Sequence, residues 1–117
     1  MHTTVPTKPP GLDLEFALAR VGGDVDLLRE IAGLFIEDYP RVVNQLDEAI
    51  ARGDAQTLER TAHGLKGSVA TFGAHDAMEA ARTLESLGRA HKFEEVRQVL
   101  TTLELALAAL RPELERL

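Results

Sequence analysis

The chain has 117 residues, enough for one domain with its own hydrophobic core. It contains no cysteine, which excludes disulfides, thiolate zinc sites and thiol nucleophiles. Its net charge of −6 argues against a nucleic-acid partner, because phosphate binding requires a basic surface. No apolar run approaches the roughly 20 residues of a membrane span, and residues 1–11 lack the apolar core of a signal peptide. We therefore expect a cytoplasmic protein without membrane insertion.

Residues 1–11 (MHTTVPTKPPG) differ in composition from the rest of the chain. They include three prolines and almost no apolar side chain. Such a composition predicts a flexible or polyproline-like segment, either the stub of a linker or a disordered terminus. We therefore place one folded domain at residues 12–117.

The first part of this domain predicts one short and one long helix. Asp13 can cap a short helix that stops at Gly22-Gly23, and Asp24 can cap a longer helix that ends at Gly53. Pro40 interrupts the longer helix, but the apolar pattern resumes directly after it. We therefore expect a kink or a brief break at Pro40.

Three further helices are predicted at about residues 55–72, 75–87 and 93–110. Their expected stops are Gly73, Gly88 and Pro112. There is no sustained alternation typical of strands, and the connections are short. The predicted fold is therefore all-α: an up-down antiparallel four-helix bundle with an additional short N-terminal helix packed across an end or side.

The helix at about 55–72 has an unusual polar face. At about 100° per residue, its apolar side chains fall on one arc roughly 80° wide, the expected core stripe. His63 lies about 140° from the centre of this arc, so it points to solvent or to a seam with a neighbouring helix. Lys66, Gly67 and Ala70 follow on the same face. The stripe consists of Leu58, Ala62, Leu65, Val69 and Phe72.

Gly64 and Gly67 are costly in the interior of a helix, by roughly 1 kcal/mol each relative to alanine. They mark either tight packing against a neighbour or a clearing around His63. A neutral imidazole is nucleophilic at cytoplasmic pH without a separate base, and a lysine one turn away can partly neutralise a phosphoryl group on it. These residues alone indicate a possible site, since a histidine on a helix surface is often merely solvated.

Residues 62–68 read AHGLKGS, and Gly73-Ala74 follow. This string resembles the His-x-x-Lys-Gly signature of histidine phosphotransfer (Hpt) domains of bacterial phosphorelays. The likeness extends from about Leu12 to Leu110. Further matching positions are Gly22-Gly23-Asp24, Leu27-Leu28, Phe35, Tyr39-Pro40, Gly53-Asp54 and Leu84-Glu85.

The resemblance implies that His63 accepts the phosphoryl group, that Lys66 stabilises it and that Gly67 keeps the approach open. Glu85 matches a position where some relatives carry glutamine and orient the imidazole. A carboxylate there would favour the Nδ1–H tautomer and leave Nε2 as the nucleophile. The alternative for Glu85 is an ordinary solvated or salt-bridged surface residue.

The resemblance also implies the partners. We expect a monomer that exchanges phosphoryl groups with the receiver domains of a hybrid sensor kinase or a response regulator, without kinase activity of its own. Its docking surface would include Gly64, Gly67 and Ala70. No metal or cofactor is expected in this chain, with Mg²⁺ only in the receiver. The alternatives are a non-catalytic interaction module and the first domain of a chemotaxis-type kinase.

Overall fold

The computed structural model describes residues 11–117, which form five α-helices and no β-strand. The all-α class predicted from the sequence is confirmed. The helices are α1 (Leu14–Arg20), α2 (Val25–Arg52), α3 (Ala55–Ala70), α4 (His75–Arg89) and α5 (Val96–Glu115). Of the predicted N-terminal segment, residues 1–10 lie outside the described residues, and Gly11 is buried beside Glu113.

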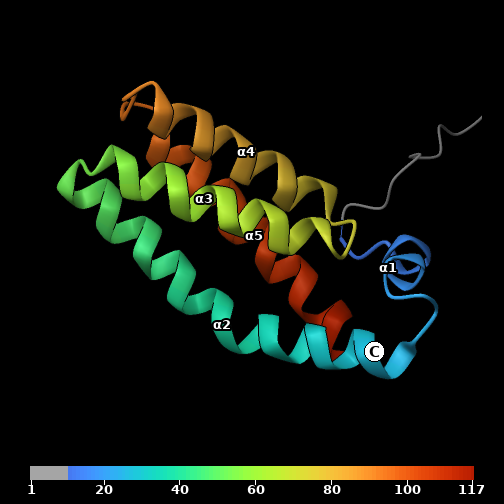
Figure 1. Cartoon of the computed structure of the whole chain (residues 1–117). Helices are drawn as coiled ribbons and strands as arrows, with labels where there is room; N and C mark the ends of the chain where they lie inside the picture. The colour runs from blue at the N-terminus through green and yellow to red at the C-terminus, as the bar shows by residue number, and fades with distance from the viewer. Residues whose placement is uncertain (1–10) are drawn as a thin grey trace, which may run out of the picture.

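The four long helices close into a bundle. α3 packs between α2 and α4, and α5 packs against both α4 and α2. Successive helices run antiparallel because their connections are short (Figure 1). α1 lies across one end, where the backbone N–H of Asp13 donates to the carbonyl oxygen of Phe72 at 2.9 Å. This is the predicted bundle with an extra N-terminal helix.

Aspartates cap the first three helices, and the caps at Asp13 and Asp24 are those predicted from the sequence. Asp13, Asp24 and Asp54 each accept a hydrogen bond from the backbone N–H three residues later, at 3.0–3.1 Å. Each such cap satisfies a backbone donor that has no partner within its helix and stabilises the helix by about 1 kcal/mol. Gly53 ends α2 in the left-handed conformation, with φ of 67°.

The predicted core stripe on α3 is confirmed. Its five side chains, at positions 58, 62, 65, 69 and 72, have exposed fractions of at most 3%. Their burial fixes the rotation of α3 about its axis, so its opposite face is turned outward. Within residues 11–117, none of the helices combines the length and apolar character needed to cross a membrane.

Several helices continue through prolines and glycines at which a stop or a break was predicted. α2 remains one helix through Pro40 and changes direction part-way (Figure 1), which matches a kink and not a break. α5 begins at Val96 and continues through Pro112 to Glu115, so the predicted end near residue 110 is wrong. Pro112 removes one hydrogen bond near the helix end, while the buried Leu114 favours the extra turn.

The predicted stop at Gly88 is also wrong. α4 continues to Arg89, and Gly88 is buried inside it. A Cβ atom at position 88 would lie 3.0 Å from the backbone nitrogen of Glu59 and 3.2 Å from the carbonyl oxygen of Ala55. Gly88 is therefore a packing residue that lets α3 and α4 approach closely. α3 itself ends at Ala70, two residues before its predicted end.

Candidate functional site

His63 lies on the outward face of α3, at the seam with α4. Its side chain is 67% exposed, and its Nδ1 atom lies 2.7 Å from Oε2 of Glu85 on α4. The sequence predicts that His63 points either to solvent or to a seam with a neighbouring helix. In the structure its side chain does both, because it is exposed and also contacts α4. The core stripe on one side of α3 turns the ring outward, and the close approach of α4 supplies its partner.

Glu85 is a buried carboxylate, not a solvated surface residue. Its side chain is 8% exposed, and it accepts hydrogen bonds from three cationic or potentially cationic groups. Nζ of Lys66 lies 2.7 Å from Oε1, whereas Nδ1 of His63 and Nη2 of Arg89 share Oε2 at 2.7 and 3.2 Å. A buried charge is tolerated only when it is paired in this way.

The pairing keeps Glu85 ionised. The hydrogen bond from Lys66 lowers the pKa of the Glu85 carboxyl most; burial works in the opposite direction, and the hydrogen bond from His63 lowers this pKa further. An ionised carboxylate can only accept hydrogen bonds, so Nδ1 of His63 must be the donor. In the neutral ring this places the lone pair on Nε2. No described residue forms a hydrogen bond to Nε2.

Gly64 and Gly67 mark open space. A Cβ atom at either position would meet nothing within 4 Å among the described residues. The alternative of tight helix packing at these glycines is therefore wrong, and the glycine that serves packing is Gly88. Ala70, one turn beyond, is half-buried. The surface of α3 beside His63 therefore has open space at positions 64 and 67.

Arg89 and Glu59 belong to the same cluster, although the sequence analysis did not identify them. Nε of Arg89 lies 2.9 Å from Oε2 of Glu59 on α3, and the same guanidinium reaches Glu85. The sequence could have indicated Arg89, because residues four apart on one helix, such as Glu85 and Arg89, can form an ion pair. No pattern in the sequence indicates Glu59, because its partner lies on another helix.

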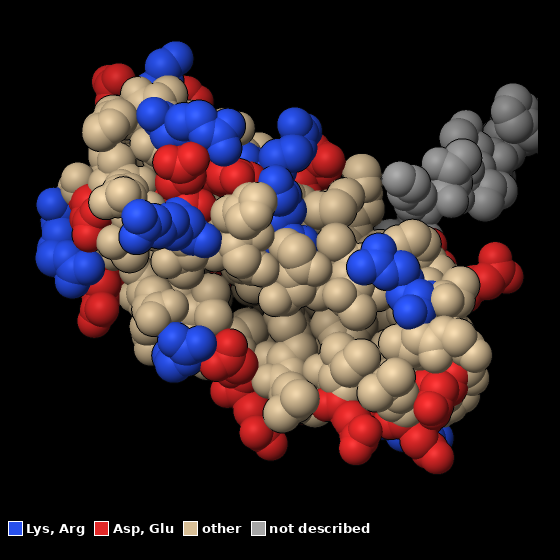
Figure 2. Space-filling model, in the orientation of Figure 1, with Lys and Arg blue, Asp and Glu red and all other residues tan. Residues whose placement is uncertain are grey.

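Charged and uncharged areas alternate on the face around His63. Figure 2 shows Lys and Arg side chains interspersed with acidic ones over α3 and α4, acidic side chains along the edge formed by α2, and an uncharged area between them. Most of the cations over α3 and α4 are paired with carboxylates, among them Lys66 with Glu85 and Arg89 with Glu59. Among residues 11–117, no three acidic or histidine side chains are placed to hold a metal ion.

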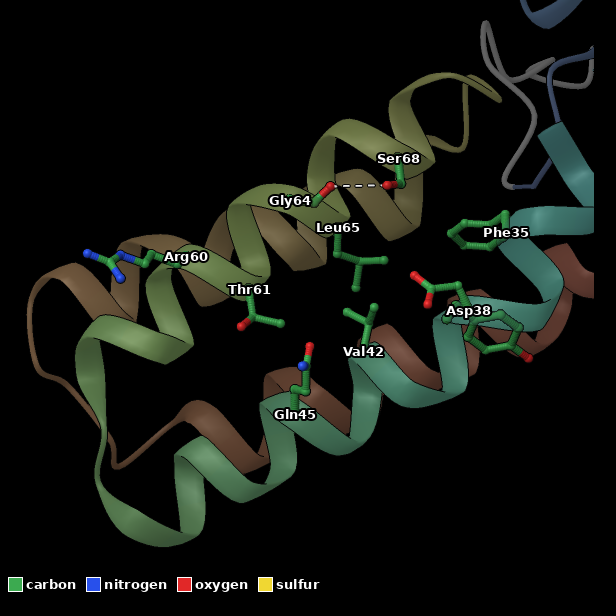
Figure 3. Close-up of a pocket in the computed structure, with 10 residues that line it drawn as sticks. Phe35, Asp38, Val42, Gln45, Arg60, Thr61, Gly64, Leu65 and Ser68 are labelled. Carbon is green, nitrogen blue, oxygen red and sulfur yellow. Dashed lines mark hydrogen bonds between the residues drawn. The ribbon is translucent and has the colours of Figure 1, made fainter.

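A groove of about 340 Å³ runs between α2 and α3 beside the site (Figure 3). We call it the α2/α3 groove. Gly64 and Ser68 line it on α3, and the hydroxyl of Ser68 donates to the Gly64 carbonyl oxygen at 3.2 Å. A second hollow adjoins it, beside Leu34, which is 67% exposed. The groove is lined by Phe35, Asp38, Tyr39, Val42 and Gln45 from α2 and by Arg60, Thr61, Gly64, Leu65 and Ser68 from α3.

Together these features give an imidazole of fixed orientation with an outward lone pair on Nε2. A ring held in this way can attack an electrophile that approaches from solvent. The described residues around it include no serine or threonine nucleophile hydrogen-bonded to the ring. The chemistry of this site therefore centres on His63 itself.

Comparison with known proteins concerns the family and the fold of this chain. The sequence model of the Hpt domain family matches residues 30–113. A relative from Arabidopsis thaliana, histidine-containing phosphotransfer protein 4, is 28% identical over 92 residues, which cover 77% of this chain and 72% of that protein. The crystal structure of histidine-containing phosphotransfer protein B from Pseudomonas aeruginosa matches the fold with a TM-score of 0.85 at 24% identity, over 93% of this chain and 95% of that chain.

Proposed function

The chain belongs to the Hpt domain family, and from this premise we propose that it is a phosphorelay intermediate that carries a phosphoryl group on Nε2 of His63. One observation carries the assignment to His63. Its ring is exposed and is anchored through Nδ1 to the buried Glu85 carboxylate, so that Nε2 faces outward with its lone pair available.

The proposed transfer needs no additional base. The Nε2 lone pair attacks the phosphorus of an aspartyl phosphate on a receiver domain, and the bond from phosphorus to the aspartate oxygen breaks. The aspartate leaves as a carboxylate with the bonding electrons. The Nδ1 proton stays in place, so the phosphorylated ring becomes an imidazolium whose positive charge lies against Glu85. Transfer to a receiver reverses these steps and releases a neutral imidazole.

Lys66 is suited to stabilise the phosphoryl group. It lies one helical turn from His63 on the same face, and its side chain is 29% exposed. Its ammonium group contacts Glu85 when His63 is unmodified and can turn to the phosphoryl oxygens when they arrive. Gly67 supports the same step by leaving room for the partner's phosphorylated aspartate.

The proposed partner is a receiver domain that docks over the clearing of Gly64, Gly67 and Ala70. The α2/α3 groove is continuous with this clearing through Gly64, so one interface can cover both. The aspartate and Mg²⁺ expected in a receiver would supply the phosphorylating centre. This chain would serve as a carrier, a cytoplasmic monomer without cofactor or kinase activity.

The test is phosphoryl transfer from receiver domains labelled with ³²P-phosphate on aspartate. The wild type should become labelled, and His63→Gln should not. The matched control is His91→Gln, the same substitution at an exposed histidine in the α4–α5 connection, which should be labelled like the wild type. The label should resist alkali and be lost in acid, as expected of a phosphoramidate.

Equal labelling of His63→Gln would refute the assignment of the site. If a broad panel of receivers bound the wild type without labelling it, the carrier function would be refuted. The non-catalytic interaction module would then be the better description.

A further inference from the structure

Glu85 has a second cationic partner that the transfer chemistry does not use. Nη2 of Arg89 lies 3.2 Å from Oε2, the same oxygen that accepts the hydrogen bond from Nδ1 of His63. Arg89 is in turn fixed by Glu59, whose Oε2 atom lies 2.9 Å from its Nε atom. The guanidinium thus ties the Glu85 carboxylate to α3 as well as to α4.

This tie matters once Lys66 turns to a phosphoryl group. Oε1 of Glu85 then loses its donor, because Lys66 provides the hydrogen bond to that oxygen. If Glu85 had no other hydrogen-bond donor, its carboxylate and the His63 ring would be held only by each other. No contact would then fix the orientation of this pair relative to the rest of the bundle. A buried carboxylate that loses one of its positive partners is also less able to stay charged.

We propose that Arg89 is a positioning residue that holds the Glu85 carboxylate charged and aimed at Nδ1 of His63 while Lys66 is engaged elsewhere. The inference rests on the proposed function in one respect: phosphorylation of His63 is the event that draws Lys66 away from Glu85. The geometry itself is independent of that event, since the contacts of Arg89 exist in the unmodified protein.

The charged groups that face Glu85 are consistent with this role. α3 contributes His63, Lys66 and Glu59, and α4 contributes Arg89 one turn after Glu85. Glu59 keeps the guanidinium beside Glu85, and the hydrogen bond that Arg89 donates to Glu59 is the main reason that the pKa of Arg89 is raised. Arg89 itself is 62% exposed, so its removal leaves no cavity in the core.

The test uses Lys66→Ala to reproduce the state in which Lys66 has left Glu85. The ¹⁵N chemical shifts of the His63 ring report which nitrogen carries the proton. Lys66→Ala should keep the Nδ1–H tautomer, whereas Lys66→Ala with Arg89→Ala should lose this preference and approach the tautomer ratio of a free histidine. Lysine at position 89, Arg89→Lys, should restore most of the preference.

Arg82→Ala in the Lys66→Ala background is the matched control. Arg82 is an exposed arginine on the same helix that pairs with Glu79, so this variant should keep the Nδ1–H tautomer. Circular dichroism should show equal helix content in all variants. Retention of the tautomer in the Lys66→Ala/Arg89→Ala protein, or its loss in Lys66→Ala alone, would overturn the proposal.

A second measurement separates this inference from the proposed function. Small-molecule phosphoramidate should phosphorylate His63 without any receiver, and Nδ1 should then remain protonated in the wild type and lose its proton in Arg89→Ala. Failure of phosphoramidate and receivers to label His63 would count against the proposed function alone. The tautomers of the unmodified variants would still decide the role of Arg89.

Discussion

Gly67→Ala should make the protein more stable and a poorer phosphoryl acceptor. A Cβ atom at position 67 meets nothing within 4 Å, and the backbone there is helical, so alanine fits without strain. Alanine is favoured over glycine in a helix interior by about 0.5–1 kcal/mol. With an unfolding entropy of about 2.1 cal/mol/K per residue, a domain of this size should gain roughly 2–4 °C in Tm.

The same methyl group should slow transfer from a receiver domain. It projects from the face of α3 that carries His63, one turn along, where a docked partner must come close. A shift of the reacting atoms by about 1 Å can cost up to about 100-fold in rate, so we expect a slowing of about 10-fold or more. Labelling by phosphoramidate should be unchanged, because a small donor reaches Nε2 without covering Gly67.

The assay pairs thermal unfolding followed by circular dichroism with ³²P transfer kinetics. Gly33→Ala is the matched control: Gly33 also lies inside a helix with nothing within 4 Å of a Cβ atom, but it does not line the α2/α3 groove. It should show the gain in Tm and normal transfer. A lower Tm for Gly67→Ala, or transfer at the wild-type rate, would refute the interpretation of Gly67 as a clearing for a partner.

Two further predictions concern α4. Because the pKa of Glu85 is lowered in the folded protein, its contribution to stability is present above the ordinary value of 4.5 and is lost as the pH falls through the lowered value. Urea unfolding at a series of pH values below about 5 should therefore show a steeper loss of stability in the wild type than in Glu85→Gln, and equal slopes would contradict the ion pairing. Gly88→Ala should destabilise the protein by about 0–2 kcal/mol, because the strain of forcing α3 and α4 apart, about 1–3 kcal/mol, exceeds the gain in helix propensity. A rise in Tm would show that the helices can separate at little cost.

Features that depend on one helix at a time could be predicted from the sequence. The caps at Asp13, Asp24 and Asp54 follow from local hydrogen bonding of a short polar side chain. The exposure of His63 follows from the 3.6-residue period, since the apolar stripe fixes which side of α3 faces the core. The resemblance then added Glu85, which no periodicity could have placed against the ring.

Features that depend on how two helices meet could not be predicted. Gly88 has the sequence appearance of a helix stop, and only the position of the α3 backbone shows that it serves packing. The extra turn after Pro112 depends on the burial of Leu114 and on Glu113, whose carboxylate accepts a hydrogen bond from the backbone N–H of Leu12. Glu59 joins the site through a contact between α3 and α4.

A carboxylate close to a phosphorylated ring is repelled by the phosphoryl group, since both groups carry negative charge. The contacts of Glu85 explain why it can be tolerated. In the proposed transfer, Lys66 turns from Glu85 to the phosphoryl oxygens and the carboxylate loses one positive neighbour, while the ring gains a positive charge because Nδ1 keeps its proton. The positive charge beside the carboxylate would thereby be conserved, and Arg89, which contacts it in the unmodified protein, would add to it. The amide oxygen of a glutamine could accept a hydrogen bond from Nδ1, but the neutral amide would not stabilise the imidazolium. Glu85 should therefore favour the protonated phosphohistidine, the form from which the phosphoryl group leaves with a neutral imidazole behind it.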